Sequence, residues 1–280
     1  MVYIYSYAGA RFPQGGGCGS SEIDLAAVPI PTGEPPGVQL CTFILAFAND
    51  DGQGNFSPQW DTDHYSAQNL AGVTAALPTV NFALSLGGGN ASWPSPGDAQ
   101  SWVSNAVSSI RGIMQAYGLT GVDVDYENGL DDTFVPVMSS LITQLTPAFW
   151  SLAPYTQTLD TYLDLYDSVA GAGVKPTINF QAYSMESENE QDYINIYSQI
   201  QKDSRVSSHG GANVGLGIDS NTVQPRGMQY PAITDLCFSQ FEQGSTVPQG
   251  LWDVAMIWSI EDSCTNGYPV ERTLSGPPPS

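Results

Sequence analysis

Basic residues are scarce in this 280-residue chain, where seven Lys and Arg stand against 28 Asp and Glu for a net charge of -21. Such a surface repels polyanions, so we expect neither nucleic acid nor an anionic membrane as a partner. Charged residues make up only 12% of the chain and hydrophobic residues 41%, which is typical of a folded protein rather than a disordered one. A neutral polymer or a divalent cation remains compatible with this charge.

Long apolar runs and several common motifs are also missing. No stretch approaches the roughly 18 uninterrupted apolar residues that predict a membrane span. No G-x-S-x-G elbow, P-loop or H-E-x-x-H motif occurs, and the two histidines, His64 and His209, are far apart in the sequence. We therefore predict neither a metal site nor a cofactor.

Short apolar segments alternate along the chain with segments of helical period, a pattern that predicts a parallel α/β fold rather than a sandwich. Eight of the apolar segments have the length of strands, and eight parallel strands close a (β/α)8, or TIM, barrel. The predicted strands are residues 2–8, 40–47, 80–86, 121–126, 150–153, 177–183, 214–218 and 254–259.

The helices expected between these strands differ in clarity. Residues 98–117 place Trp102, Ile110 and other apolar side chains on one face before Gly118 ends the helix. Similar stripes predict helices within 66–77, 133–145 and 193–200. The first helix, 21–28, should be short and opened by a Ser21-x-x-Asp24 capping pattern, and the last should be little more than 270–274. We predict one domain over 1–274 and a flexible tail over 275–280, which contains Gly-Pro-Pro-Pro.

Three carboxylates alternate with apolar or aromatic residues in the segment 121–127, and the strand period of two puts Asp123, Asp125 and Glu127 on one face. In a half-exposed strand this would only mark the solvent side. Both faces of a barrel strand are buried, however, and three carboxylates there would be costly without a purpose. Their repulsion must raise at least one pKa, and Glu127 reaches the rim where barrel enzymes act. A protonated acid at that rim suits the cleavage of a glycosidic bond.

The same segment resembles the D-G-x-D-x-D-x-E signature of glycoside hydrolase family 18, the chitinases and their inactive relatives. Ser85-Leu86-Gly87-Gly88 resembles the S-x-G-G motif of that family, Gln181-Ala182-Tyr183 its Q-x-Y motif and Trp258 its floor tryptophan, all in the expected order. The likeness spans nearly the whole chain. It is nearest to the plant branch of class III chitinases and narbonin, as residues 43–48 and 102–106 indicate.

The resemblance implies an endo-type chitinase that hydrolyses β-1,4-linked N-acetylglucosamine polymers by substrate-assisted retaining catalysis. Glu127 would act as general acid and base, protonating the leaving oxygen while the substrate's own acetamido carbonyl attacks the anomeric carbon. Asp125 would orient the acetamido group, Asp123 would hold Asp125, and the Tyr183 hydroxyl would bond the acetamido oxygen. No cofactor is implied.

Other residues of these motifs are expected near the bound sugar. Trp258 would form the floor on which the apolar face of the sugar stacks. Ser85 and Gly87 either contact the ligand or simply permit tight packing beside the carboxylate strand. The substrate-binding candidates are Gln181, Trp258, Tyr7, Phe47, Tyr126, Ser85 and Gly87.

Two positions depart from the family pattern. Thr120 replaces the first Asp of the signature, which should weaken the hydrogen-bonded chain that steadies Asp123, and Ser184 stands where the plant enzymes usually carry Asn. The alternative hypothesis is a weak or inactive relative that serves as a carbohydrate-binding, storage or inhibitor protein. The net charge and the acidic cluster Glu186, Glu188, Glu190 and Asp192 would suit a storage protein that binds calcium.

Four cysteines without a C-x-x-C spacing allow three disulfide pairings. The loops after the first and last strands meet where the barrel closes, so Cys18 with Cys264 is the first pair to test. Sequons at 55–57 and 90–92 suit a secreted protein. The first strand follows Met1 directly, so we expect no signal peptide within the chain. We predict a secreted or vacuolar monomer, with the cytoplasm as the alternative location.

Overall fold

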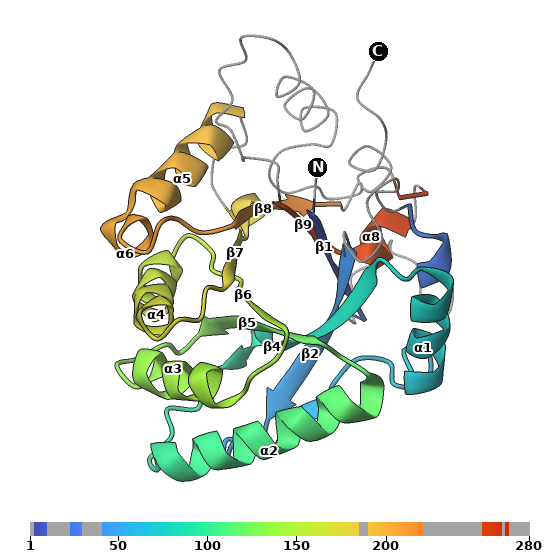
Figure 1. Ribbon diagram of the computed structural model, residues 1–280, viewed down its shortest axis with the longest axis horizontal. Coiled ribbons are helices and arrows are strands. Elements are labelled where there is room, and N and C mark those ends of the chain that lie inside the picture. Colours follow the sequence, from blue (N-terminus) through green and yellow to red (C-terminus); the bar gives the residue numbers. More distant parts are fainter. Residues whose placement is uncertain are drawn as a thin grey trace.

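The computed structural model describes residues 3–9, 23–29, 41–184, 190–220, 254–264 and 267–268. Within them, eight parallel strands form a closed barrel in which each pairs with the next and β1 pairs with both β2 and β9 (Figure 1). These strands are β1 Tyr3–Ala8, β2 Cys41–Asp50, β4 Val80–Ser92, β5 Gly121–Asn128, β6 Phe149–Leu152, β7 Thr177–Phe180, β8 Val214–Asp219 and β9 Val254–Trp258. The predicted (β/α)8 barrel is confirmed.

The strands differ from the prediction at several places. Strand β7 ends at Phe180 rather than at residue 183, and Ala182–Ser184 form a short 3-10 turn, η3, at the rim. Strand β4 runs on to Ser92, because beyond an irregularity after Gly88 it pairs again with the end of β5. A short strand, β3 Phe56–Pro58, pairs antiparallel with β2 and was not predicted. A strand of three residues is too short for an alternating pattern to be recognised in the sequence.

Four predicted helices are present, as α1 Ala67–Ala76, α2 Ala99–Tyr117, α3 Phe134–Gln144 and α5 Glu190–Lys202. Helix α2 begins where the Asp98 side chain accepts from the Ser101 N–H, and ends at Gly118 in the left-handed conformation. Within the described residues, three helices were missed: α4 Leu159–Gly171, α6 Ser204–Ser207 and α8 Ile260–Cys264. Helix α4 buries Leu159, Tyr162, Tyr166 and Val169 at helical spacing, so its sequence did carry the signal.

The predicted first helix is reduced in the described residues to a 3-10 turn, η2 Leu25–Ala27, whose opening Asp24 accepts from the Ala26 N–H at 3.0 Å. Ser21, predicted to cap it, lies outside the described residues. So do the predicted last helix 270–274 and the tail 275–280, and the single domain over 1–274 stays a prediction. The expectation of a short first helix came from the Gly- and Pro-rich sequence around it.

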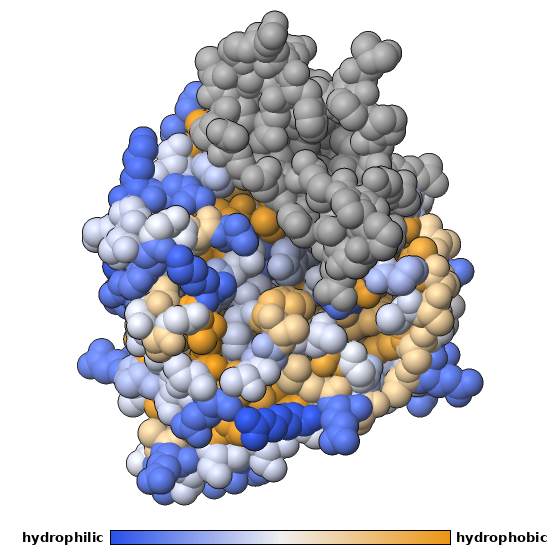
Figure 2. All heavy atoms as spheres, in the orientation of Figure 1, coloured by the Kyte–Doolittle hydropathy of each residue, from blue (hydrophilic) through white to orange (hydrophobic). Residues whose placement is uncertain are grey.

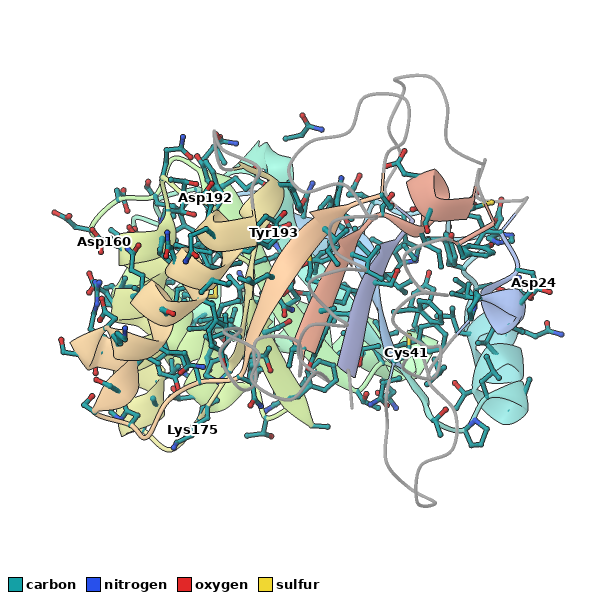
Figure 3. The ribbon with its side chains drawn as sticks, turned by 90° about the horizontal axis from the view of Figure 1, so that it is seen from above. Asp24, Cys41, Asp160, Lys175, Asp192 and Tyr193 are labelled. Carbon is teal, nitrogen blue, oxygen red and sulfur yellow. The ribbon has the colours of Figure 1, made fainter. Side chains whose placement is uncertain are left out.

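The barrel separates an outer core from a small inner one. Outward side chains of the strands pack under the helices. In Figure 2 hydrophilic residues gather at the periphery over α4, α5 and α6 on the left. The inner cluster contains Tyr7, Ile44, Ala46, Ala83 and Met256, with partly buried aromatic side chains packed against it. Figure 3 shows the barrel from the side. Cys41, the first residue of β2, and Lys175, just before β7, lie at the end where strands begin, and Asp192 of α5 lies at the opposite end. No helix of the described residues is long and apolar enough to cross a membrane.

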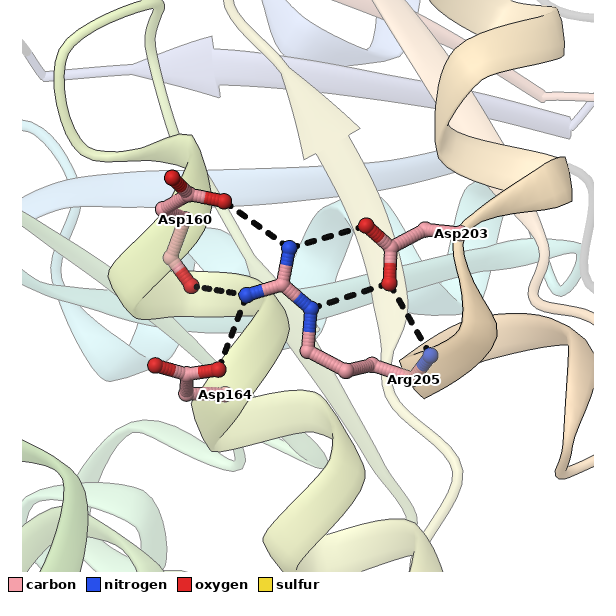
Figure 4. A network of polar contacts seen from close by, with 4 residues as sticks. All are labelled: Asp160, Asp164, Asp203 and Arg205. Atoms are coloured by element: carbon pink, nitrogen blue, oxygen red, sulfur yellow. Dashed lines mark hydrogen bonds and ion pairs between the residues drawn. The ribbon is translucent and has the colours of Figure 1, made fainter.

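An ion-pair network ties α4 to α6 on the outside of the barrel (Figure 4). Both terminal nitrogens of Arg205 lie 2.8 Å from carboxylate oxygens, contributed by Asp160 and Asp164 of α4 and by Asp203, which caps α6. Because Asp160 and Asp164 are exposed, water screens these pairs and their net contribution to stability is small. The network orients α4 and α6 relative to each other and forms no part of a functional site.

The turn after β2 offers a matched test of packing. Gly52 and Gly54 both adopt positive φ, +84° and +87°, but a Cβ at Gly54 would lie 2.3 Å from the Trp102 carbonyl oxygen, whereas one at Gly52 meets nothing within 4 Å. We expect Gly54→Ala to lower the free energy of unfolding by about 3 kcal/mol or more, and Gly52→Ala by about 1 kcal/mol. Urea denaturation of the two variants checks this, and equal losses would show that the backbone of α2 yields to the added methyl group.

Candidate active site

The three carboxylates of β5 lie on the inner face of the barrel at increasing depth. Asp123 is 0% exposed and Asp125 3%, whereas Glu127 at the rim is partly exposed. The alternating residues Val122 and Val124 belong to the outer core. The strand period of two therefore separates an acidic inner row from an apolar outer row.

Three hydroxyl groups from three other strands converge on Asp123. Tyr7 of β1 and Ser85 of β4 donate to Oδ2 at 2.9 and 2.7 Å, and Ser151 of β6 donates to Oδ1 at 2.6 Å. Burial raises the pKa of Asp123 to about 6, while these three hydrogen bonds lower it. Both carboxylate oxygens of Asp123 accept hydrogen bonds, so the side chain is held in one orientation. Asp123 therefore gives the row a fixed lower end.

Ser151 was not identified from the sequence. Its signal is the barrel register, because Ser151 of β6 and Ser85 of β4 both stand directly opposite Asp123 on the neighbouring strands. Residues in register on adjacent parallel strands point to the same side of the sheet. A predicted register would have found both serines, whereas the S-x-G-G pattern pointed to Ser85 alone.

Gln181 connects the two upper carboxylates. Its Nε2 donates to Asp125 Oδ1 at 2.8 Å, to Glu127 Oε1 at 3.3 Å and to the Ala153 carbonyl at 3.0 Å. The Tyr183 hydroxyl in turn donates to Gln181 Oε1 at 3.1 Å. The structure thus brings together Asp125, Glu127, Gln181 and Tyr183 at the carboxyl-terminal end of the barrel.

The pKa values of the upper carboxyls are raised. For Asp125 burial is the largest cause, and repulsion by Glu127 and Asp123 adds to it, while the Gln181 hydrogen bond opposes it. For Glu127 burial raises the pKa and the Gln181 hydrogen bond again lowers it. Three carboxyls this close cannot all be charged, so the row retains protons above the pH at which an exposed carboxyl loses them.

Aromatic rings lie beside the row. Trp258, at the end of β9, stacks on Phe47 with centroids 5.8 Å apart and packs against Tyr7 at 5.2 Å. Trp258, Phe47 and Tyr183 are each partly exposed, whereas Tyr7 is fully buried. The accessible aromatic surface is therefore formed by the first three rings, with Tyr7 supporting them from below.

The glycine run of β4 permits close approach to this surface. Gly87 has φ +104° and a Cβ there would lie 3.0 Å from the Asp125 carbonyl oxygen. At Gly88, with φ +91°, a Cβ would meet the Phe47 ring at 2.7 Å. Of the two readings open for Gly87, tight packing beside β5 has a structural basis in these contacts.

Tyr126 is not brought together with the other candidates. It follows Asp125 on β5 and therefore points outward, where it is 1% exposed and packs against Trp93 and Phe134. Its hydroxyl donates to Asp50 Oδ1 at 3.3 Å. The prediction of Tyr126 as a neighbour of the sugar overlooked the alternation that placed the three carboxylates inward.

Thr120 forms hydrogen bonds away from Asp123, the residue whose support it was expected to affect. Its hydroxyl donates to Asn81 Oδ1 at 3.2 Å at the amino-terminal end of the barrel, and its N–H donates to the Phe82 carbonyl at 2.8 Å. The expectation that Thr120 would weaken the support of Asp123 is wrong, because that support comes from Tyr7, Ser85 and Ser151.

Tyr155 is a rim residue that sequence analysis missed. It lies just after β6, is partly exposed, and its hydroxyl donates to the Glu127 carbonyl oxygen at 3.2 Å. No family motif contained it. Its proximity to Glu127 arises only because the loops after β5 and β6 are neighbours in the barrel.

Several sequence predictions concern residues that are not described. Glu186 and Glu188 of the acidic cluster lie outside the described residues, as does Cys18, so the pairing of Cys18 with Cys264 stays a prediction. Within the described part of the chain, no group of three His, Cys, Asp or Glu side chains is arranged to hold a metal ion.

Comparison with known proteins adds a second line of evidence. No family model matches the chain. It is 36% identical over 169 residues to Chitinase 1 of Tulipa saxatilis subsp. bakeri, 53% of this chain and 54% of that protein. It is also 32% identical over 88 residues to the RuBisCO-associated protein of Glycine max, 29% of this chain and 31% of that one. The chain thus matches about half or less of the length of these relatives.

Among solved structures, a family 18 chitinase from Crocus vernus superposes with a TM-score of 0.73 at 25% identity, covering 95% of both chains. The likeness to this structure extends over the whole barrel, whereas the matches to the tulip and soybean proteins are partial.

Proposed function

We propose that this chain is a member of glycoside hydrolase family 18, to whose chitinases it is similar, and that it cleaves β-1,4-linked N-acetylglucosamine polymers internally. The observation that carries the proposal is the inward row of β5, in which Glu127 is accessible at the rim above two buried carboxyls. An acid so placed can reach a glycosidic oxygen, whereas Asp123 and Asp125 support it from below.

In the proposed reaction Glu127 donates its proton to the leaving glycosidic oxygen. The carbonyl oxygen of the acetamido group on C2 of the same sugar attacks its anomeric carbon, the glycosidic bond breaks, and a cyclic oxazolinium ion forms. Glu127, now a carboxylate, then takes a proton from water, whose oxygen opens the ring with retention of configuration. The enzyme supplies no nucleophile of its own, in keeping with a row whose deeper members are inaccessible to the anomeric carbon.

The neighbours of Glu127 act on the acetamido group. Asp125 accepts from its N–H and stabilises the positive charge that develops on the oxazolinium ring. Asp123, held by three hydroxyls, steadies Asp125 from below. The Tyr183 hydroxyl, at present donating to Gln181 Oε1, turns to donate to the acetamido oxygen. Trp258 and Phe47 present ring faces to the apolar face of the sugar.

Burial of Glu127 sets the proposed pH dependence. Its pKa is raised, so the folded enzyme keeps the proton that it must donate to a higher pH than an exposed glutamate would. Activity should therefore persist from acidic pH upwards and fall as the pH rises through the raised pKa. We further propose that the protein acts as a secreted monomer on chitin or chito-oligosaccharides.

Hydrolysis of chitohexaose tests the function. The purified protein is incubated with the hexamer from pH 3 to pH 8, and products are followed by mass spectrometry. We expect dimers, trimers and tetramers together, because internal cleavage of a hexamer yields several lengths. Early release of dimers and tetramers without any trimer, the pattern of cleavage from one chain end, would contradict the endo mode. The absence of any product at every pH would contradict the chitinase assignment.

A further inference from the structure

A buried acid outside the catalytic row joins the two ends of the sheet where the barrel closes. Glu261 lies on α8, three residues after Trp258, and is only 7% exposed. Its Oε1 accepts from the Gly9 N–H at 2.6 Å and from the Tyr65 hydroxyl at 3.1 Å. Gly9 follows β1 directly, so one carboxyl connects the segment after β9 to the segment after β1.

The two connected segments carry rings of the candidate active site. Tyr7 is two residues before Gly9, and Trp258 is three residues before Glu261, and these two rings pack at 5.2 Å. Gly9 leaves no room for a side chain, because its φ is +84° and a Cβ there would lie 2.8 Å from Cβ of Trp60. Glu261 is only three residues from Trp258 along the chain, so a displacement of Glu261 is transmitted to the end of β9.

The surroundings of Glu261 suit a neutral carboxyl better than a charged one. Its second oxygen, Oε2, is buried and has no hydrogen-bond partner among the described residues. None of the ion pairs in that part of the chain involves Glu261. A buried carboxylate with one bare oxygen and no cation is unstable, whereas a proton on Oε2 removes the charge.

The other titratable groups near Glu261 also favour its neutral form, because none of them supplies a positive charge. Tyr65 donates to Glu261, and Asp61 and Tyr268 lie close enough to act electrostatically on Tyr65. Asp262, the next residue of α8, is half buried and approaches the Ser259 hydroxyl, and the His64 ring packs edge-on against Tyr65. None of the groups that act on Glu261 itself is a cation. Burial raises the pKa of Glu261 to about 7, and the Gly9 and Tyr65 hydrogen bonds oppose that rise.

We propose that Glu261 is a positioning residue that, in its protonated form, fastens the β9 rim to the β1 rim and so holds Trp258 in place. Its ionisation loosens this link because the cost of burying a charge without a cation outweighs the hydrogen bonds from Gly9 and Tyr65. The effect on hydrolysis rests on the proposed function, whereas the link itself does not. A substrate whose sugar stacks on Trp258 then binds more weakly above neutral pH.

The sign of the stability effect follows from linkage. The carboxyl is neutral in both states below its unfolded pKa near 4.5, so its contribution is fully present there. As the pH rises towards about 7 the unfolded chain loses this proton before the folded chain does, and stability falls. Above that value the loss is complete and constant. Glu261→Gln keeps an acceptor for Gly9 and Tyr65 but cannot ionise, so it escapes this loss.

Thermal denaturation from pH 4 to pH 8 tests the link without any assay of activity. Relative to the wild type, we expect the melting temperature of Glu261→Gln to rise by about 5 °C across this range. Asp63→Asn, which removes an exposed acid ahead of α1, should give a curve parallel to the wild type. Parallel curves for Glu261→Gln and the wild type would overturn the proposal.

Tyr65→Phe provides a second variant with a predicted direction. Because the Tyr65 hydrogen bond lowers the pKa of Glu261, its removal should move the pH-dependent fall in stability to higher pH. A merely structural role for Tyr65 would lower the melting temperature equally at every pH, and that result would count against an ionisable link.

Positioning of Trp258 is measured in two ways. The KM for chitohexaose should rise about threefold more between pH 5 and pH 8 in the wild type than in Glu261→Gln, with similar kcat. Acrylamide quenching of Trp258, taken as the difference from Trp258→Phe, should increase over the same range only when Glu261 is present. A constant KM ratio together with unchanged quenching would overturn the positioning role. If the wild type hydrolyses nothing, the chitinase proposal fails, while melting and quenching still decide the role of Glu261.

Discussion

Glu127→Gln is expected to lower kcat for chitohexaose by at least about 1,000-fold, since a general acid contributes roughly 10²–10⁴-fold and the other two carboxyls of the inward row are buried. Gln keeps the size of the side chain and can still contact the Gln181 amide, which lies 3.3 Å from Glu127 Oε1. Binding should therefore survive, with a KM or dissociation constant within a fewfold of the wild type. Mass spectrometry of products and calorimetric titration of the hexamer measure the two effects separately.

A matched control for this substitution is Asp132→Asn, which removes one negative charge from an exposed position shortly after β5. It should hydrolyse chitohexaose at the wild-type rate. Retention of full activity by Glu127→Gln would exclude Glu127 as the acid and with it the proposed mechanism. Equal losses in both variants would mean that overall charge near the rim, rather than a proton on Glu127, governs the rate.

Asp125→Asn is expected to lower kcat by about 100- to 1,000-fold, the usual cost of removing one electrostatic stabiliser of a transition state. Asn can still accept from Gln181 Nε2, now 2.8 Å from Asp125 Oδ1, so the geometry should persist while the carboxyl is lost. The oxazolinium charge is then left without its counter-charge. Steady-state kinetics on chitohexaose measures the loss, again against Asp132→Asn.

The two substitutions should differ in how pH affects the remaining activity. Asp125→Asn retains Glu127, so its residual rate should still fall as the pH rises through the raised pKa of that residue. Glu127→Gln has lost that group, and any residual rate should lack this fall. Identical pH profiles in both variants would contradict the assignment of the acid to Glu127 and of charge stabilisation to Asp125.

The strand count and the acidic row could be predicted from the sequence because both depend on local periodicity. Each barrel strand is a short apolar run between helical segments, and a spacing of two along β5 decides which side chains share a face. The same rule, applied strictly, would have placed Tyr126 outward. That error came from weighing residue type above position.

Partners far apart in the chain could not be predicted in this way. The hydroxyl of Tyr7 reaches Asp123 across 116 positions, and the Gly9 N–H reaches Glu261 across 252. Such pairs depend on the strand order and register, which bring the ends of β1, β5 and β9 to one rim. Ser151 and Tyr155 lie in no recognisable motif for the same reason.

The sequence alone determined the barrel class and the inward carboxylate row, since these follow from spacing and alternation within short segments, and its motifs carried the family resemblance. Only the tertiary structure decided how the row is supported, by three hydroxyls under Asp123 and one amide between Asp125 and Glu127. It also revealed the buried carboxyl of Glu261 at the point where β1 and β9 close the barrel. Hydrogen bonds and burial arise between elements, and the protonation of a carboxyl depends on both, so the chemistry of each acid is a property of the folded chain.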